Sequence, residues 1–204
     1  MKTLNRLLFL LVLGLLGSCY PGGVQFYEDT DIVYTTRKDD FDFNSKSTFA
    51  MPDKIVIDVE IKNGDTTYIY MEDRFAQPIL QNIQANLQNF GWTKVEISQN
   101  PSMLLTPSAT KSTSVYYSYW YDWWYGGFYP GWGWYYPPYF TVSTITTGTV
   151  IITLSDPNGT NIVGESETAW LMVGNGLLSG SNNVDRVNRA VDQAFEQSTY
   201  LDLN

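Results

Sequence analysis

Residues 55–91 read IVIDVEIKNGDTTYIYMEDRFAQPILQNIQANLQNFG, and this stretch decides the fold. Two runs of strand-forming residues flank Asn63-Gly64, a dipeptide that favours the tight turn of a β-hairpin. Apolar residues then recur at helical spacing, namely Ala76, Ile79, Leu80, Ile83, Leu87 and Phe90. The pattern predicts a hairpin followed by an amphipathic helix over about 75–90, with Pro78 in its first turn and Gly91 as its C-terminal cap.

Extended segments are expected on both sides of this stretch. Upstream, residues 32–36 and 48–51 are rich in β-branched and aromatic residues. Downstream, the chain is expected to be extended over 92–97 and over 103–121. The sequence therefore predicts strands both before and after the first helix.

The C-terminal part again pairs strands with a helix. A long strand is expected at about 140–155, then a turn at Asp156-Pro157-Asn158-Gly159 and a partner strand from about 160 to 173. The spacing of Val184, Val187, Val191 and Phe195 predicts a second amphipathic helix over 183–197. The expected class is α+β: an antiparallel β-sheet with both helices packed on one face.

Composition excludes several classes of function. The chain of 204 residues has a formal net charge of -9, no His and one Cys. Phosphate backbones would repel such a chain, so nucleic acid is not an expected partner. Ser-His and Cys-His nucleophiles and His-ligated metals are absent from the sequence, and we expect no catalytic residue, no cofactor and no metal site.

The N-terminus has the organisation of a secretory signal peptide over residues 1–18: basic residues, an apolar run and a small-residue cleavage site. Leu16-Gly17-Ser18-Cys19 also resembles a bacterial lipobox, which implies that Cys19 becomes the lipidated N-terminus. Residues 19–30 are then expected to be a tether and residues 31–204 one domain. The alternative is an ordinary signal peptide that leaves Cys19 as a lone thiol.

Tyr20 follows the cysteine. By resemblance to the best-studied lipoprotein sorting systems, this residue favours the outer membrane over the inner membrane. We expect a periplasm-facing lipoprotein, with exposure at the cell surface left open as the alternative.

An aromatic tract, defined as residues 116–140, contains 16 aromatic residues among its 25 positions. Glycine and proline interrupt it, so it is expected to form a long loop between two strands. A domain of this size cannot bury so many rings, and large exposed aromatic patches mark contact surfaces. The candidate binding surface consists of Trp120, Trp123, Trp124, Tyr125, Tyr129, Trp132, Trp134 and Tyr135.

Four roles compete for this tract. Binding of an envelope protein, or self-association, is favoured because aromatic, charge-poor surfaces form the centres of interfaces. Glycan or peptidoglycan binding is the first alternative, since Trp and Tyr offer flat faces and polar edges. Contact with lipid headgroups is the second, and packing of the loop over the uncovered sheet face is the third.

Carboxylates allow one enzymatic alternative, because a glycosidase needs only two of them. Glu165 and Glu167 are two apart on an expected strand, and Asp122 lies inside the aromatic tract. Alternating acids on a strand are more often a solvated face. Separately, Asp65-Thr66-Thr67 looks like a short acceptor motif for periplasmic O-glycosylation, which leaves modification of Thr66 open.

Several motifs together resemble the domain of unknown function 4136 family of Gram-negative envelope lipoproteins. They are Phe41-Asp42-Phe43, Thr48-Phe49-Ala50-Met51-Pro52, Asn89-Phe90-Gly91-Trp92, Asn100-Pro101-Ser102-Met103-Leu104, the aromatic tract and the run from Gly148 to Leu154. The resemblance covers about residues 30–200. It departs from the common pattern at Val163-Gly164, where many members have a Trp. The family has no established activity, so the resemblance implies a location and a fold but no catalytic residue.

Overall fold

The computed structural model describes residues 32–62, 65–110, 148–160, 166–178 and 183–204. The described residues all belong to one compact unit, Asp31–Asn204. The strands are β1 (Val33–Arg37), β2 (Thr48–Ala50), β3 (Val56–Lys62), β4 (Asp65–Tyr70), β5 (Thr93–Lys94), β6 (Met103–Thr110), β7 (Thr149–Thr160) and β8 (Ser166–Gly174). The helices are α2 (Asp73–Asn89) and α4 (Asn183–Glu196), with three short 3-10 turns at Phe43–Ser45, Ile97–Gln99 and Thr199–Leu201.

The eight strands form one sheet, in the order β1-β8-β7-β6-β2-β5, and β3 pairs with both β4 and β6. The pairs β1/β8, β7/β8, β6/β7 and β3/β4 are antiparallel, as expected. The pairs β2/β6, β3/β6 and β2/β5 are parallel, so the sheet is mixed and the expectation of an antiparallel sheet is confirmed only in part. A parallel pair needs a long crossover, and α2 supplies it because this helix lies between β3 and β6 in the chain.

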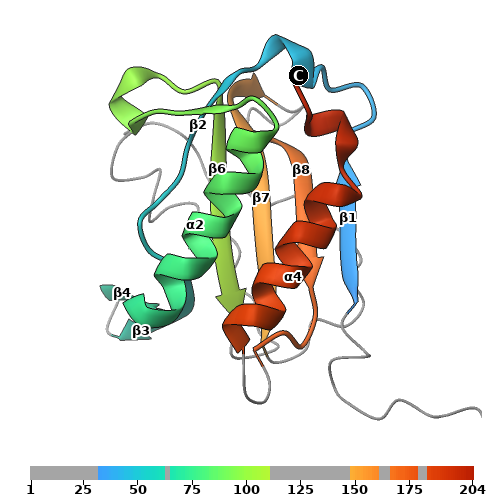
Figure 1. Ribbon diagram of the computed structural model, residues 1–204. Helices are drawn as coiled ribbons and strands as arrows, with labels where there is room; N and C mark the ends of the chain where they lie inside the picture. The colour runs from blue at the N-terminus through green and yellow to red at the C-terminus, as the bar shows by residue number, and fades with distance from the viewer. Residues whose placement is uncertain (1–31, 63–64, 111–147, 161–165, 179–182) are drawn as a thin grey trace, which may run out of the picture. The chain divides into compact units, whose positions relative to one another are not determined.

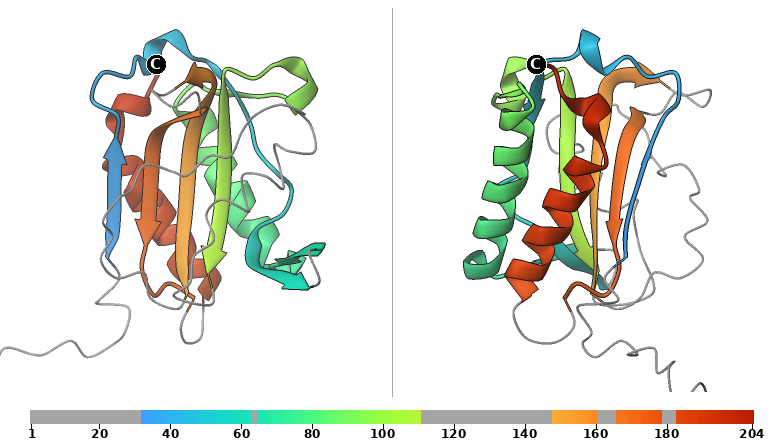
Figure 2. Two further views of the ribbon diagram at one scale, coloured as in Figure 1. Left: turned by 180° about the vertical axis from the view of Figure 1, so that it is seen from behind. Right: turned by 45° about the vertical axis from the view of Figure 1, so that its right-hand side comes forward.

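Both helices pack on the same face of the sheet, as expected (Figures 1 and 2). The predicted spans, 75–90 and 183–197, agree with α2 and α4 to within two residues. Because α2 begins at Asp73, Pro78 lies in its second turn rather than its first. Gly91 has φ +85°, and the amides of Gly91 and Trp92 donate to Gln88 and Leu87, which closes the helix as the glycine predicted.

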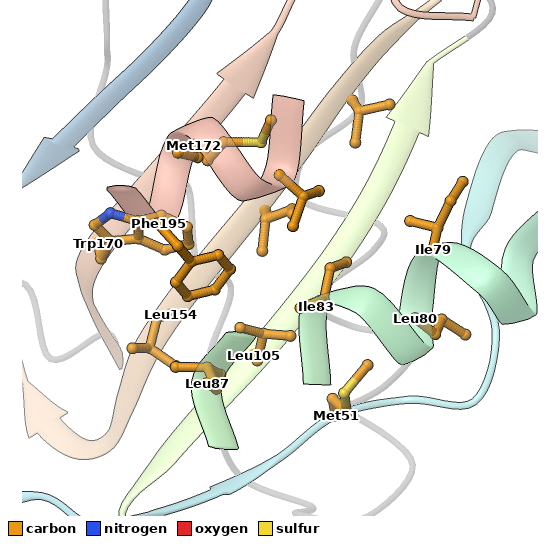
Figure 3. Packing of buried hydrophobic residues seen from close by; sticks show 14 of the residues in the cluster. Met51, Ile79, Leu80, Ile83, Leu87, Leu105, Leu154, Trp170, Met172 and Phe195 are labelled. Carbon is orange, nitrogen blue, oxygen red and sulfur yellow. The ribbon is translucent and has the colours of Figure 1, made fainter. Parts of the chain in front are cut away.

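The core lies between this sheet face and the two helices (Figure 3). It joins Ile79, Ile83 and Leu87 of α2 to Phe195 of α4, and both helices to inward residues of the sheet. The inward sheet residues include Leu105, Leu154, Trp170 and Met172. Burial of each such side chain contributes about 1.5–3 kcal/mol, so the two apolar stripes hold the layers together.

The turn expected at Asp156 to Gly159 does not reverse the chain. Asp156 to Gly159 belong to β7, where the register shifts between Asp156 and Thr160, and Thr160 already pairs with Ser166. The Pro-Asn-Gly sequence therefore forms an irregularity inside a strand rather than the strand reversal. β8 accordingly begins at Ser166, later than the predicted partner strand. Among the described residues, no helix is long and apolar enough to cross a membrane.

Candidate functional site

The residues singled out from the sequence lie largely outside the described residues. This applies to Cys19, to the tether and to all eight aromatic candidates: Trp120, Trp123, Trp124, Tyr125, Tyr129, Trp132, Trp134 and Tyr135. It also applies to Asp122 and Glu165, while Glu167 is placed in β8 by its backbone alone. The described residues do show where these segments join the domain.

Four strands present a common row at one end of the sheet. Val33 of β1 and Val150 of β7 both pair with Gly174 of β8, and Val150 also pairs with Ala109 of β6. The row crosses four adjacent strands, so its three inter-strand spacings give it a length of about 14 Å. We call this end of the sheet, defined by Val33, Gly174, Val150 and Ala109, the entry end.

Three chain connections meet at the entry end. The chain from the N-terminal segment reaches the domain at Ile32, next to Val33. Thr110, the last residue of β6, pairs with Thr149 at the start of β7, so the segment containing the aromatic tract leaves and rejoins the sheet on adjacent strands. Ile32, Thr110 and Thr149 are therefore at the same end of the sheet, although they are far apart in sequence.

A pocket of about 350 Å³ lies at the entry end, and its lining includes Phe75 near the start of α2 and Val184 at the start of α4. Its apolar lining comes from Ile57, Ile69, Met71, Ile79, Leu178 and Val184. Tyr70, Glu72, Phe75 and Gly148 complete the lining. Such a pocket can accept an apolar side chain or a similar small apolar group.

Gly148 shapes the pocket at the point where the chain returns to β7. Its φ is +86°, and a Cβ placed there would lie 3.2 Å from the Cβ of Leu178 and 3.3 Å from backbone atoms of Leu178. The amide of Leu178 donates a hydrogen bond of 3.1 Å to the carbonyl of Gly148. Glycine is therefore required both for the backbone conformation and for the close approach.

The rim of the pocket combines aromatic rings with cations. Arg74 lies over the ring of Phe75, with Cζ 4.5 Å from the ring centroid, and its Nε is 2.9 Å from Oε2 of Glu72. Nζ of Lys54 lies 5.0 Å from the ring centroid of Tyr70. The sequence did not predict this rim. The one local indication of it is Phe75, an aromatic residue just outside the apolar stripe of α2.

Exposed large hydrophobic residues gather at the same end. Among the described residues they are Ile32 (67% exposed), Tyr34 (48%) and Phe75 (39%). Ile32 directly precedes the entry row, Tyr34 pairs with Val173 one position inside it, and Phe75 lines the pocket. All three therefore lie at or next to the entry end.

The helix-free sheet face offers no open apolar surface among the described residues. On its central strands the uncharged residues Leu104, Ser108, Ile151, Leu171 and Val173 are all buried. A sheet face open to water normally carries polar, often charged, side chains. The entry end is therefore the better candidate for contact with another molecule.

Two further ion pairs lie outside the pocket lining. Lys46 and Asp156 form a largely buried pair at 2.7 Å. On the β3–β4 hairpin, the pKa of Lys62 is raised by a hydrogen bond to Glu60 and by the charge of that carboxylate. Among the described residues, no three His, Cys, Asp or Glu side chains are grouped so that they could hold a metal ion.

Comparison with known proteins places these features in a recognised domain. A family model named DUF4136, a domain of unknown function, matches residues 33–198. The fold is similar to the crystal structure of a DUF4136 family protein from Bacteroides thetaiotaomicron, with a TM-score of 0.65 and 27% sequence identity. That similarity covers 85% of this chain and 98% of that chain. No curated protein matches the sequence.

Proposed function

The chain belongs to the DUF4136 family, and from this premise we propose that it is a non-enzymatic, lipid-anchored envelope protein that binds a protein partner, or a second copy of itself, through its aromatic tract. The proposed location is the outer membrane, with the domain facing the periplasm. The anchor is the lipidated Cys19, and residues 19–30 are the tether.

One observation carries the proposal: the tract segment leaves and rejoins the sheet at the end that also holds the apolar pocket. Thr110 and Thr149 are paired, and Gly148 belongs to the pocket lining. Interface centres are built from aromatic anchors and pockets that receive apolar groups. The pocket extends the proposed contact surface from the tract onto the described domain.

The non-enzymatic part of the proposal rests on the side chains available. The chain has no His and one Cys, and that Cys is assigned to the anchor. The common acid–base and nucleophile pairs therefore lack a member. Carboxylate chemistry is the remaining option, and the test below includes it.

Photo-crosslinking in cells tests the proposal. A photoreactive residue replaces Trp124 or Tyr129 in the tract, or Gln88 as a control on the exposed side of α2. We expect the tract positions to yield a specific protein adduct, and Gln88 to yield none. A matched variant with residues 122–138 replaced by a short Gly/Ser linker should keep its membrane location and lose the adduct.

The result that overturns this function is a shortened variant that folds, remains at the membrane and keeps every adduct of the parent. A change in Trp fluorescence on adding purified peptidoglycan, without any protein adduct, would instead establish the glycan-binding alternative. Release of sugar product that is lost on Glu165→Gln or Asp122→Asn would establish a glycosidase.

A further inference from the structure

The entry end carries the features of a surface that lies on lipid headgroups. We propose that this end of the domain rests on the membrane to which the protein is anchored, with Phe75, Ile32 and Tyr34 at the lipid interface. This inference rests on the lipid anchor of the proposed function and goes beyond its protein partner. It assigns the described domain a second contact, with a lipid surface, and an orientation.

The tether limits which end of the domain can reach the membrane. Twelve residues, 19–30, separate the acylated cysteine from the domain, and a flexible chain of that length has a root-mean-square span of about 19 Å. The chain enters the described domain at Ile32, at the entry end. The opposite end of β6 lies about 26 Å farther away, given eight residues at 3.3 Å each.

The side chains at this end match the chemistry of the headgroup region. Aromatic rings prefer the boundary between headgroups and acyl chains, and Arg and Lys extend toward phosphates while their stems contact apolar groups. The Arg74–Phe75 and Lys54–Tyr70 pairs place a cation over a ring twice on the pocket rim. The large hydrophobic residues exposed among the described ones lie at or next to this end.

The charges around the pocket rim indicate which class of lipid headgroup this end can contact. Glu72 and Asp73 lie beside Arg74, and the whole chain carries a formal net charge of -9. Attraction to an anionic surface requires an excess of cations, which this end lacks. The surface therefore suits zwitterionic headgroups, where each cation meets a phosphate without a net electrostatic pull.

Depth-dependent fluorescence quenching tests the orientation on the lipidated full-length protein. After acylation the Cys19 thiol is a thioether, so one introduced cysteine is the sole free thiol in the chain. An environment-sensitive fluorophore is attached at Phe75, Gln81 or Gln88, three exposed positions along α2, or at Thr199 near the C-terminus. Gln81 and Gln88 lie about 9 and 20 Å along the helix from Phe75. The protein is reconstituted into phosphatidylcholine vesicles with and without spin-labelled lipid.

We expect quenching at Phe75 to exceed quenching at Gln88 and Thr199 at least threefold, with Gln81 between them. Replacing part of the lipid with phosphatidylglycerol should leave this order unchanged. Equal quenching at all four positions, strongest quenching at Gln88 or Thr199, or a gradient that requires the anionic lipid would each overturn the inference. The vesicles contain no other protein, so the result does not depend on a protein partner.

The mass of the purified protein separates the two possible failures. An acylated chain without a quenching gradient overturns the orientation and leaves the proposed function standing. A chain without acyl groups overturns the lipid anchor and, with it, this inference. Circular dichroism of each labelled variant, compared with the parent, verifies that the substitutions leave the fold intact.

Discussion

The indole Nε1 of Trp170 donates a hydrogen bond of 2.9 Å to the Oγ of Ser198, and both side chains are buried. Trp170 belongs to β8, and Ser198 lies two residues after the end of α4. The hydroxyl of Tyr200 donates to the same oxygen at 3.2 Å. One serine oxygen therefore accepts hydrogen bonds from the sheet and from the C-terminal segment.

Ser198→Ala should destabilise the protein by about 1–3 kcal/mol, because it leaves the buried indole N–H without its acceptor. Urea unfolding of the soluble Cys19→Ala form measures the effect. Thr199→Ala, at the exposed neighbouring position, is the control and should change the free energy of unfolding by less than about 0.5 kcal/mol. Equal effects of the two substitutions would contradict the role assigned to Ser198.

The pair of Lys46 and Asp156 should show measurable coupling. Asp156 accepts from Lys46 through Oδ2 and from the amide of Asn158 through Oδ1, at 2.7 and 2.8 Å. Lys46→Met removes the Lys46 cation from a mostly buried carboxylate, and we expect a loss of about 1–3 kcal/mol. A double-mutant cycle with Asp156→Asn should give a coupling energy above about 0.5 kcal/mol.

The exposed pair of Lys62 and Glu60, at 2.6 Å, is the matched control for this cycle. Lys62→Met should leave stability unchanged within error, since water and salt screen an exposed pair. A larger effect at Lys62 than at Lys46 would refute the assignment of the buried pair.

Gly148→Ala should destabilise the domain by about 1–3 kcal/mol, because alanine disfavours φ +86° and its Cβ would crowd Leu178. Thermal unfolding of the Cys19→Ala form measures the loss. Unchanged stability would show that the chain can enter β7 without a positive φ at this position.

Cys19→Ala should release the protein from the membrane fraction into the soluble periplasm, since acyl chains hold a lipoprotein far more strongly than its side chains can. Detergent-phase partitioning and fractionation measure the change. Cys19→Ala protein that still sediments with membrane lipid would contradict the anchor.

The sequence predicted the elements whose signals are local. The spacing of Ile79, Ile83 and Leu87 predicted a helix that is closed by Gly91. This was possible because an apolar residue in each turn and a glycine cap are both encoded within a few residues. The hairpin on either side of Asn63-Gly64 is confirmed, since Lys62 pairs with Asp65. The family resemblance taken from short motifs is confirmed by the family match over residues 33–198.

Two predictions failed where long-range pairing prevailed over local preference. The turn signal at Pro157 to Gly159 lies inside β7, because Thr160 still pairs with Ser166. The sheet is mixed because β2 and β3 both pair with β6 in parallel. Whether a pair is parallel depends on which strands become neighbours after the α2 crossover. The candidate aromatic residues, such as Trp124, lie outside the described residues, so their role stays a prediction.

By itself the sequence determined the class of the protein: two amphipathic helices on a sheet, an acidic chain without histidine, a lipobox-like Cys19 and an aromatic tract. Only the tertiary structure decided that Ile32, Thr110 and Thr149 meet at one end of the sheet, beside Phe75 and an apolar pocket. The physical reason is that periodicity and capping act over a few residues. Strand register, in contrast, brings together segments more than a hundred residues apart, and no local pattern records it.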